Sequence, residues 1–309
     1  MRDESKLTDR DFIPHPSALI LGSIHWARRG AETPGQEVPM NAAEPPVLYE
    51  QDGPIVTVTL NRPEVMNNFG GGLFPALGEA LARFQEADSA RVLILTGKGR
   101  AFCAGADLKN IEARLREGGP VLASRTPEGQ RRSYYANQKV TRRTDVYKPI
   151  LGAVNGYCFA GGLEVALMCH FRIGAESSEY GVLNRRWAVP LVDGGTYRLP
   201  LVVGLGNALY LIQTGARIDA AAAYRIGLIQ ELVPDSQLLP RARELAGIMA
   251  TVPQAGLRGD TEAVFRGLGR TPEDGLALET IIGSSVLTSD DFRQGPARFA
   301  EKRYDPVTG

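Results

Sequence analysis

The chain has 309 residues, enough for one large domain or two small ones with a sizeable core. Its 35 basic and 35 acidic side chains give a formal net charge of zero, so no global field draws it to nucleic acid or to an anionic membrane. With 43% hydrophobic and 23% charged residues, the composition is typical of a soluble globular protein. No apolar run reaches the ~20 residues that span a bilayer, and the N-terminus lacks a secretion-signal pattern. We therefore expect a cytoplasmic protein without a membrane or nucleic-acid partner.

The cysteines and histidines show no metal-binding pattern. Cys103, Cys158 and Cys169 lie in apolar surroundings without CxxC spacing, and the three histidines form neither HxxH nor HExxH. We interpret the cysteines as small buried hydrophobes, which fits a reducing compartment. The sequence predicts no metal site.

The first part of the chain is predicted to be a disordered extension. Residues 1–45 are rich in charge, proline and glycine and show no sustained hydrophobic period. Met40 begins "MNAAEPPVLYE", which looks like an ordinary start. We interpret residues 1–39 as a long leader or as the product of an upstream start codon.

A strand and a helix open the ordered region. Within 55–60, Val56, Val58 and Leu60 alternate with threonines, which predicts a half-buried strand after the turn "DGP". Residues 73–88 place Leu73, Leu77, Leu81 and Phe84 on one helical face.

The following segments alternate between apolar strands and helices. We expect strands within 90–97, 148–156 and 171–182, and helices within 106–118 and 161–170. Such repetition with buried strands is typical of an α/β core. We assign residues 46–250 to this core and residues 251–309 to a C-terminal helical region.

Two further segments stand apart from the repeats. Residues 112–147 are polar, basic and spotted with glycine and proline, which is typical of the rim of a site, although a solvated face is the commoner explanation of their arginines. In the C-terminal region, Pro272 suits the first turn of a helix and "TSDD" (288–291) resembles an N-cap. Val286, Leu287 and Phe299 are expected to pack on the core or on another subunit.

The stretch "GRAFCAGADLKN" (99–110) is a candidate ligand-binding loop. From Cys103 to Asp107 it has almost no side-chain bulk and then opens a helix, so a ligand can approach the main chain. Backbone N–H groups near a helix N-terminus bind negatively charged oxygen. Asp107 alone is explained equally well as a helix cap.

The stretch "AVNGYCFAGGLEVA" (153–166) has the same strand–turn–helix order. Ala160, Gly161 and Gly162 expose backbone N–H groups at a helix start, and Glu164 follows among apolar neighbours. Two donors that converge on one point form an oxyanion hole. Glu164 is explained either as a catalytic carboxylate or as a helix-start glutamate that the macrodipole favours.

Taken together with "LNRPE" (60–64) upstream and "VDGGTYRLPLVVGLGNAL" (192–209) downstream, the two stretches resemble the enoyl-CoA hydratase/isomerase (crotonase) superfamily over about residues 46–303. The resemblance implies an α/β fold, a spiral of repeated β-β-α units followed by a helical region that builds trimers or dimers of trimers. It also implies an acyl-CoA thioester as substrate and no separate cofactor, because coenzyme A is part of the substrate.

The resemblance also assigns site residues. The amides of Ala104 and Gly161 would be the two donors of the oxyanion hole. The segment "RPEVMNN" (62–68) would lie near coenzyme A, although Val65 and Met66 replace the usual basic residue there. The expected substrate-binding set is Cys103, Ala106, Asp107, Gly162, Val65 and Met66.

The acid/base machinery departs from the two-glutamate hydratases. Glu164 matches their first glutamate, but Asn184 stands at the place of the second, and an amide exchanges no protons near neutral pH. Asp193 falls within a residue of a catalytic aspartate of some dienoyl-CoA isomerases, or it is a turn residue before Gly194. His170 replaces a common aspartate and is expected to pack or to bond locally.

Three functions follow as alternatives. The first is hydration of 2-enoyl-CoA, with Glu164 as acid/base and Asn184 orienting water. The second is double-bond isomerisation by Glu164, with or without Asp193. The third is a non-catalytic acyl-CoA-binding member of the family. We favour hydration, because monofunctional isomerases more often keep the other glutamate.

Overall fold

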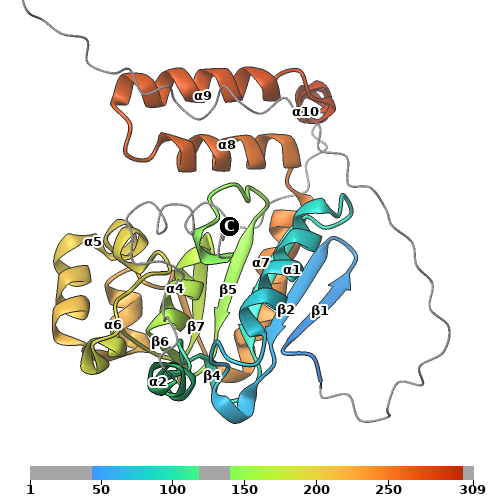
Figure 1. Ribbon diagram of the computed structural model, residues 1–309. Coiled ribbons are helices and arrows are strands. Elements are labelled where there is room, and N and C mark those ends of the chain that lie inside the picture. Colours follow the sequence, from blue (N-terminus) through green and yellow to red (C-terminus); the bar gives the residue numbers. More distant parts are fainter. Residues whose placement is uncertain (1–43, 118–139, 302–309) are drawn as a thin grey trace, which may run out of the picture. The chain divides into compact units, whose positions relative to one another are not determined.

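The computed structural model describes residues 44–117 and 140–301 (Figure 1). The predicted extension lies almost wholly outside these ranges, as does most of the polar segment 112–147. Within the described ranges, no helix is long and apolar enough to cross a membrane.

One sheet has six strands in the order β1-β2-β3-β5-β7-β10. The first two strands form an antiparallel hairpin, and the other pairs are parallel. The strands are β1 (Val47–Asp52), β2 (Ile55–Leu60), β3 (Val92–Gly97), β5 (Ile150–Val154), β7 (Phe171–Ala175) and β10 (Glu231–Val233). A parallel sheet is normally covered on both faces, which agrees with the continuous burial of β3 and β5.

The second sheet takes the strands that the first one skips. Its order is β4-β6-β8-β9, with β8 and β9 antiparallel. The strands are β4 (Ala101–Cys103), β6 (Tyr157–Phe159), β8 (Glu179–Gly181) and β9 (Arg217–Asp219). The strands from β3 to β8 form three consecutive pairs, β3 with β4, β5 with β6 and β7 with β8. The first strand of each pair lies in the six-stranded sheet and the second in the four-stranded sheet.

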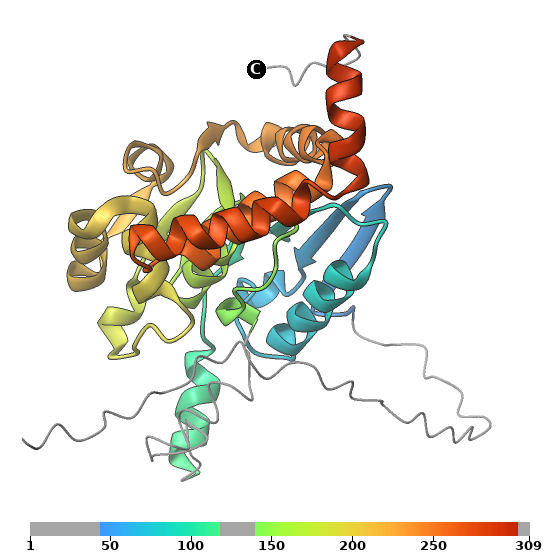
Figure 2. The same ribbon diagram turned by 90° about the horizontal axis from the view of Figure 1, so that it is seen from above.

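A helix follows each of these pairs, which confirms the predicted β-β-α repeat. The helices are α2 (Leu108–Arg116), α4 (Gly161–Met168) and α5 (Gly195–Thr214). In Figure 2, α2 projects away from the two sheets, in agreement with the exposure of most of its residues. The short helix α6 (Ala220–Arg225) follows β9.

The predicted first strand and helix are confirmed. Val56, Val58 and Leu60 point into the core from β2, and α1 (Leu73–Glu86) buries completely the four residues predicted to form its apolar face. Each such side chain stabilises the fold by roughly 1.5–3 kcal/mol relative to an exposed one.

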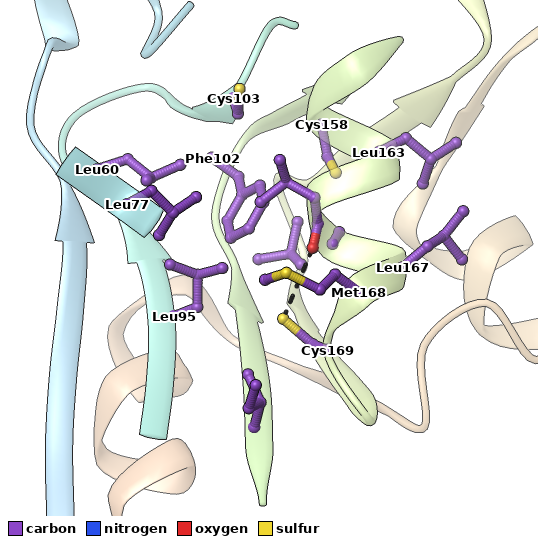
Figure 3. Close-up of a cluster of buried hydrophobic side chains, with 14 of the residues drawn as sticks. Leu60, Leu77, Leu95, Phe102, Cys103, Cys158, Leu163, Leu167, Met168 and Cys169 are labelled. Atoms are coloured by element: carbon purple, nitrogen blue, oxygen red, sulfur yellow. Dashed lines mark hydrogen bonds between the residues drawn. The ribbon is translucent and has the colours of Figure 1, made fainter. Parts of the chain in front are cut away.

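Helix α4 lies inside the core. All its residues are buried, so it is apolar on every side except at Glu164. Figure 3 shows the three cysteines in the surrounding cluster, where Cys169 Sγ approaches the carbonyl oxygen of Val165 at 3.8 Å. All three thiols are free and buried, as predicted, and burial raises the pKa of Cys103 to about 12.

The remaining helices are α7 (Leu238–Thr251), α8 (Gln254–Gly267), α9 (Pro272–Val286) and α10 (Asp290–Ala300). Helix α7 packs its alanines on the six-stranded sheet, and α8 and α9 lie side by side (Figure 1). Pro272 occupies the first turn of α9, and Ser289 caps α10 by accepting the amide of Phe292, which confirms both predicted starts.

Several apolar residues on and beside α9 and α10 stay exposed in the described part of the chain. Ile281 is 68% exposed, Phe299 is 79% exposed, and Leu276 and Leu287 are also exposed. Packing of this surface on another subunit stays a prediction.

Candidate active site

The two candidate loops meet at Gly105 and Gly161. A Cβ on Gly105 would lie 2.7 Å from the amide nitrogen of Gly161 and 3.0 Å from the carbonyl oxygen of Phe159. Gly105 also has a positive φ of 89°, which other residues rarely adopt. Two segments that are distant in the sequence are therefore held in direct backbone contact.

The prediction that Ala104 supplies an oxyanion donor is wrong in this structure. The amide of Ala104 donates to the carbonyl oxygen of Met66 at 2.9 Å, and the amide of Gly105 lies 3.4 Å from Cys103 Sγ. The amide of Ala106, in contrast, donates to no group in the described part of the chain. Gly161 is the first residue of α4, so its amide has no intrahelical acceptor. The amides available for a ligand are therefore those of Ala106 and Gly161.

Two residues predicted to touch substrate lie behind this loop instead. Cys103 is fully buried, and its thiol donates to the carbonyl oxygen of Asn67 at 3.0 Å. Gly162 packs on β4, since a Cβ there would lie 2.0 Å from the carbonyl oxygen of Cys103. Both residues support the loops from inside and were wrongly assigned to the substrate surface.

Asp107 caps α2 and borders a cavity. Its Oδ1 accepts the amide of Asn110 at 3.1 Å, so the helix-cap explanation is realised. A cavity of about 360 Å³ lies beside it, lined also by Phe69, Gly70 and Ile111. Contact with substrate is compatible with this position and stays a prediction for Asp107.

The half-buried residues Val65 and Met66 lie in and after the short helix η2 (Pro63–Val65). Met66 supplies the carbonyl that engages Ala104. This is a structural role, and coenzyme A contact by either side chain stays a prediction.

Phe69 is a site residue that the sequence reasoning missed. Its amide donates to the carbonyl oxygen of Gly105 at 2.9 Å. Its ring fills the space beside Gly161, where a Cβ would lie 2.4 Å from the ring, and it meets Phe74 edge-on with centroids 4.3 Å apart. No periodicity or spacing relates Phe69 to Gly161, so no sequence signal pointed to this contact.

Ala160 precedes α4 in a strained conformation. Its φ of 53° and ψ of −122° fall where a side chain is unfavourable. Its amide donates to the carbonyl oxygen of Gly181, and its carbonyl oxygen accepts the amide of Glu164. These two hydrogen bonds hold the strained turn in place. Such backbone strain persists only where the surrounding contacts fix the conformation, and it is often found at functional sites.

Glu164 is a buried carboxylate at the first turn of α4. It is 3% exposed, and its Oε1 accepts two backbone amides, those of Asp193 and Gly195, at 2.8 Å each. These charge-assisted bonds offset the cost of burying the carboxylate. They also tie the start of α4 to the start of α5.

Asn184 and Asp193 take different positions. Asn184 is buried in the short helix η4 (Leu183–Trp187), where its Nδ2 donates to the carbonyl oxygen of Val189 at 2.8 Å and its Oδ1 has no partner among the described residues. Asp193 is also buried and holds Glu164 through its backbone. Catalytic roles for these two side chains stay predictions.

His170 packs locally, as predicted. Its Nε2 lies 3.2 Å from the carbonyl oxygen of Val146, and its ring lies 5.2 Å from that of Phe265. Within residues 44–117 and 140–301, no group of three or more histidines, cysteines and acids is placed to hold a metal ion.

Comparison with known proteins agrees with this geometry. The family model described as enoyl-CoA hydratase/isomerase matches residues 50–308. A short-chain-enoyl-CoA hydratase of Clostridium acetobutylicum is 30% identical over 259 residues, covering 83% of this chain and 95% of that protein. A 1,2-epoxyphenylacetyl-CoA isomerase of Escherichia coli is 32% identical over 263 residues, covering 85% and 98%. The crystal structure of an enoyl-CoA hydratase/isomerase from Mycobacterium paratuberculosis has a TM-score of 0.76 at 30% identity, covering 85% and 98%.

The two sheets of β-β-α repeats and the paired loops define a crotonase-type α/β enzyme. The chain belongs to the enoyl-CoA hydratase/isomerase family.

Proposed function

We propose that the protein hydrates 2-enoyl-CoA thioesters at the site formed by Ala106, Gly161 and Glu164. One observation carries this proposal. The buried carboxylate of Glu164 sits in the first turn of the helix whose first amide, that of Gly161, faces the Gly105 loop. An oxyanion donor and a proton carrier are therefore fixed on one rigid element.

The chemistry follows from this arrangement. The thioester oxygen accepts the amides of Ala106 and Gly161, which stabilise the negative charge of the enolate. Glu164 takes a proton from water as the hydroxyl adds to C3, and it returns that proton to C2 as the enolate collapses, which regenerates the carboxylate. Relatives named as enoyl-CoA hydratases support this direction.

Isomerisation is the second candidate. Asn184 replaces one carboxylate of the hydratase pair and is engaged by Val189, whereas a shift of a double bond needs one proton carrier. A relative named as an isomerase agrees with this alternative. A non-catalytic acyl-CoA-binding protein is the third candidate.

A panel of thioesters separates the three. Purified protein is mixed with crotonyl-CoA, a 3-enoyl-CoA and a dienoyl-CoA while the enoyl absorbance is followed. Loss of the crotonyl-CoA absorbance supports hydration, and a gain from 3-enoyl-CoA supports isomerisation; the gain without the loss overturns hydration. Binding of the esters without turnover overturns both enzymatic readings.

The proposal includes a homotrimer, or a dimer of trimers, in the cytoplasm. The exposed apolar residues of α9 and α10 support association, and the three reduced, buried cysteines suit a reducing compartment. Light scattering behind a sizing column tests the first part, and a monomer would overturn it. Cell fractionation tests the second.

A further inference from the structure

A second cavity lies at the other end of α4, away from the oxyanion loops. It has a volume of about 150 Å³ and is bounded by the end of α4, β7, α5 and α8. We call it the Arg172 cavity. Its lining is mostly apolar but includes three arginines; its main residues are Leu167, Met168, Phe265, Leu268, Arg172 and Arg198.

Arg172 is a buried cation, and no acid among residues 44–117 and 140–301 pairs with it. It is 2% exposed. Its Nε donates to the carbonyl oxygen of Leu228 at 2.7 Å, and its Nη1 donates to that of Cys169 at 3.0 Å, with Ala166 at 3.5 Å. In the described part of the chain, no carboxylate bonds to it and its Nη2 donates to no group.

The ionisable groups around Arg172 do not neutralise its positive charge either. Burial lowers the pKa of Arg172, and the groups that oppose this shift are the thiols of Cys169 and Cys158 and the phenol of Tyr180. Burial raises the pKa of all three of these groups, so they are neutral at pH 7. The carbonyls at the end of α4 offset part of the positive charge, but they do not neutralise it.

The other two arginines of the cavity are already engaged. Arg143 pairs with Asp145 at 2.7 Å, and Arg198 donates to the carbonyl oxygens of Thr141 and Arg143. Arg172 is the one of the three that is buried, so its positive charge is the least screened by solvent. Buried charges are normally paired, so this exception needs an anion.

The shape and lining of the cavity restrict that anion. A cavity of this size holds about six to eight non-hydrogen atoms, since an apolar cavity of about 150 Å³ holds benzene. Leu81, Ile150 and Met168 offer an apolar wall. A fully inorganic ion would leave this wall unused, whereas a short alkyl chain with one carboxylate matches both parts.

We propose that the Arg172 cavity binds a short-chain monocarboxylate anion, with its carboxylate on Arg172 Nη2 and its alkyl group among Leu81, Ile150 and Met168. The site is separate from the loops at Gly105 and Gly161 and does not rest on the proposed hydratase activity. Occupation of the cavity would stabilise the packing of α8, through Phe265, on the end of α4.

Calorimetric titration of the full-length protein with butyrate tests this. We expect saturable binding of one butyrate per chain, with a dissociation constant of about 1 mM for a ligand of this size. Butyramide has the same shape without the charge and is expected to bind at least tenfold more weakly. Equal binding of the amide, or no saturable binding of butyrate, would overturn the proposal.

Three variants test whether butyrate binds in the Arg172 cavity. Arg172→Met is expected to weaken butyrate at least tenfold, while Arg243→Gln, on the exposed face of α7, leaves it unchanged. Because Arg172→Met leaves buried carbonyls unpaired and can unfold the chain, Leu268→Trp is the second variant. It fills the cavity from a partly exposed position and is expected to abolish binding. Unchanged affinity in Leu268→Trp would refute the assignment whatever the thioester panel shows.

Discussion

The carboxylate of Glu164 lies directly against the Cα of Gly195. The amide of Gly195 donates to Oε1 at 2.8 Å, and a Cβ on this residue would lie 2.9 Å from Glu164 Cγ and 3.0 Å from Oε1. The first residue of α5 therefore fixes the position of the carboxylate in two ways, by donating to it and by leaving room for it. The geometry of the proposed proton carrier depends on a residue without a side chain.

Replacement of Gly195 by alanine tests this dependence. The new methyl group displaces the carboxylate of Glu164, and we expect kcat to fall at least tenfold and the free energy of unfolding to fall by about 1–3 kcal/mol. Gly206→Ala is the matched control, because it lies in the same helix with nothing near its Cβ position. The control is expected to keep its activity and to gain about 0.5–1 kcal/mol. Equal kinetics of the two variants would show that the contact is unimportant.

Glu164→Gln separates proton transfer from structure. The amide oxygen of glutamine can still accept the amides of Asp193 and Gly195, so we expect the fold and KM to change little. The side chain can no longer carry a proton, and kcat on the best thioester of the panel should fall by about 10²–10⁴-fold. Steady-state kinetics with a urea unfolding curve measure both. Full activity in a folded variant would remove Glu164 from the mechanism.

The sequence predicted the elements, because these follow from local patterns, whereas the meeting of the two loops was implied by the resemblance. Each pattern specifies the secondary structure of its own segment. Examples are the alternation at Val56, the apolar face that begins at Leu73 and the glycines before Glu164. The β-β-α repeat was implied by the resemblance rather than by these patterns. It holds because alternate strands enter different sheets.

Details that depend on contacts between distant segments were not predictable. Ala104 and Ala106 have the same side chain in the same loop, and only the carbonyl of Met66 decides which amide is occupied. Cys103 was predicted to be buried and also to contact substrate, because it begins the candidate loop; its side chain is fully buried and takes only the first of these roles. Phe69 reaches Gly161 across a gap of many residues, and no period records that contact.

Ala160→Gly is expected to stabilise the protein. The backbone of Ala160 lies where glycine is favoured, and relief of such strain gives about 1–3 kcal/mol, reduced by the greater chain entropy of glycine in the unfolded state. We expect a net gain of about 1 kcal/mol in the free energy of unfolding, measured in urea. Ala153→Gly in β5 is the control and should destabilise. A loss of stability in Ala160→Gly would show that its methyl group is needed for packing.

His170 predicts how stability depends on pH. Burial lowers its pKa from 6.5 to about 4, with the carbonyl of Val146 opposing the shift. Between these two values the unfolded chain binds a proton that the folded chain does not, so acidification favours unfolding. The contribution is absent above about pH 7, grows as the pH falls from 6.5, and is complete below about pH 4, where it reaches about 3 kcal/mol.

His170→Gln isolates this contribution, because glutamine does not titrate and its amide can still donate to Val146. Unfolding by urea at several values between pH 7 and pH 4 should show a shallower loss of stability in the variant than in the wild type, with the difference growing towards pH 4. His170 also lines the Arg172 cavity, where a bound carboxylate would favour its protonated form. The free energy of unfolding of the wild type should therefore depend less steeply on pH with saturating butyrate. Without butyrate, parallel curves of this free energy for wild type and His170→Gln would refute the role of His170.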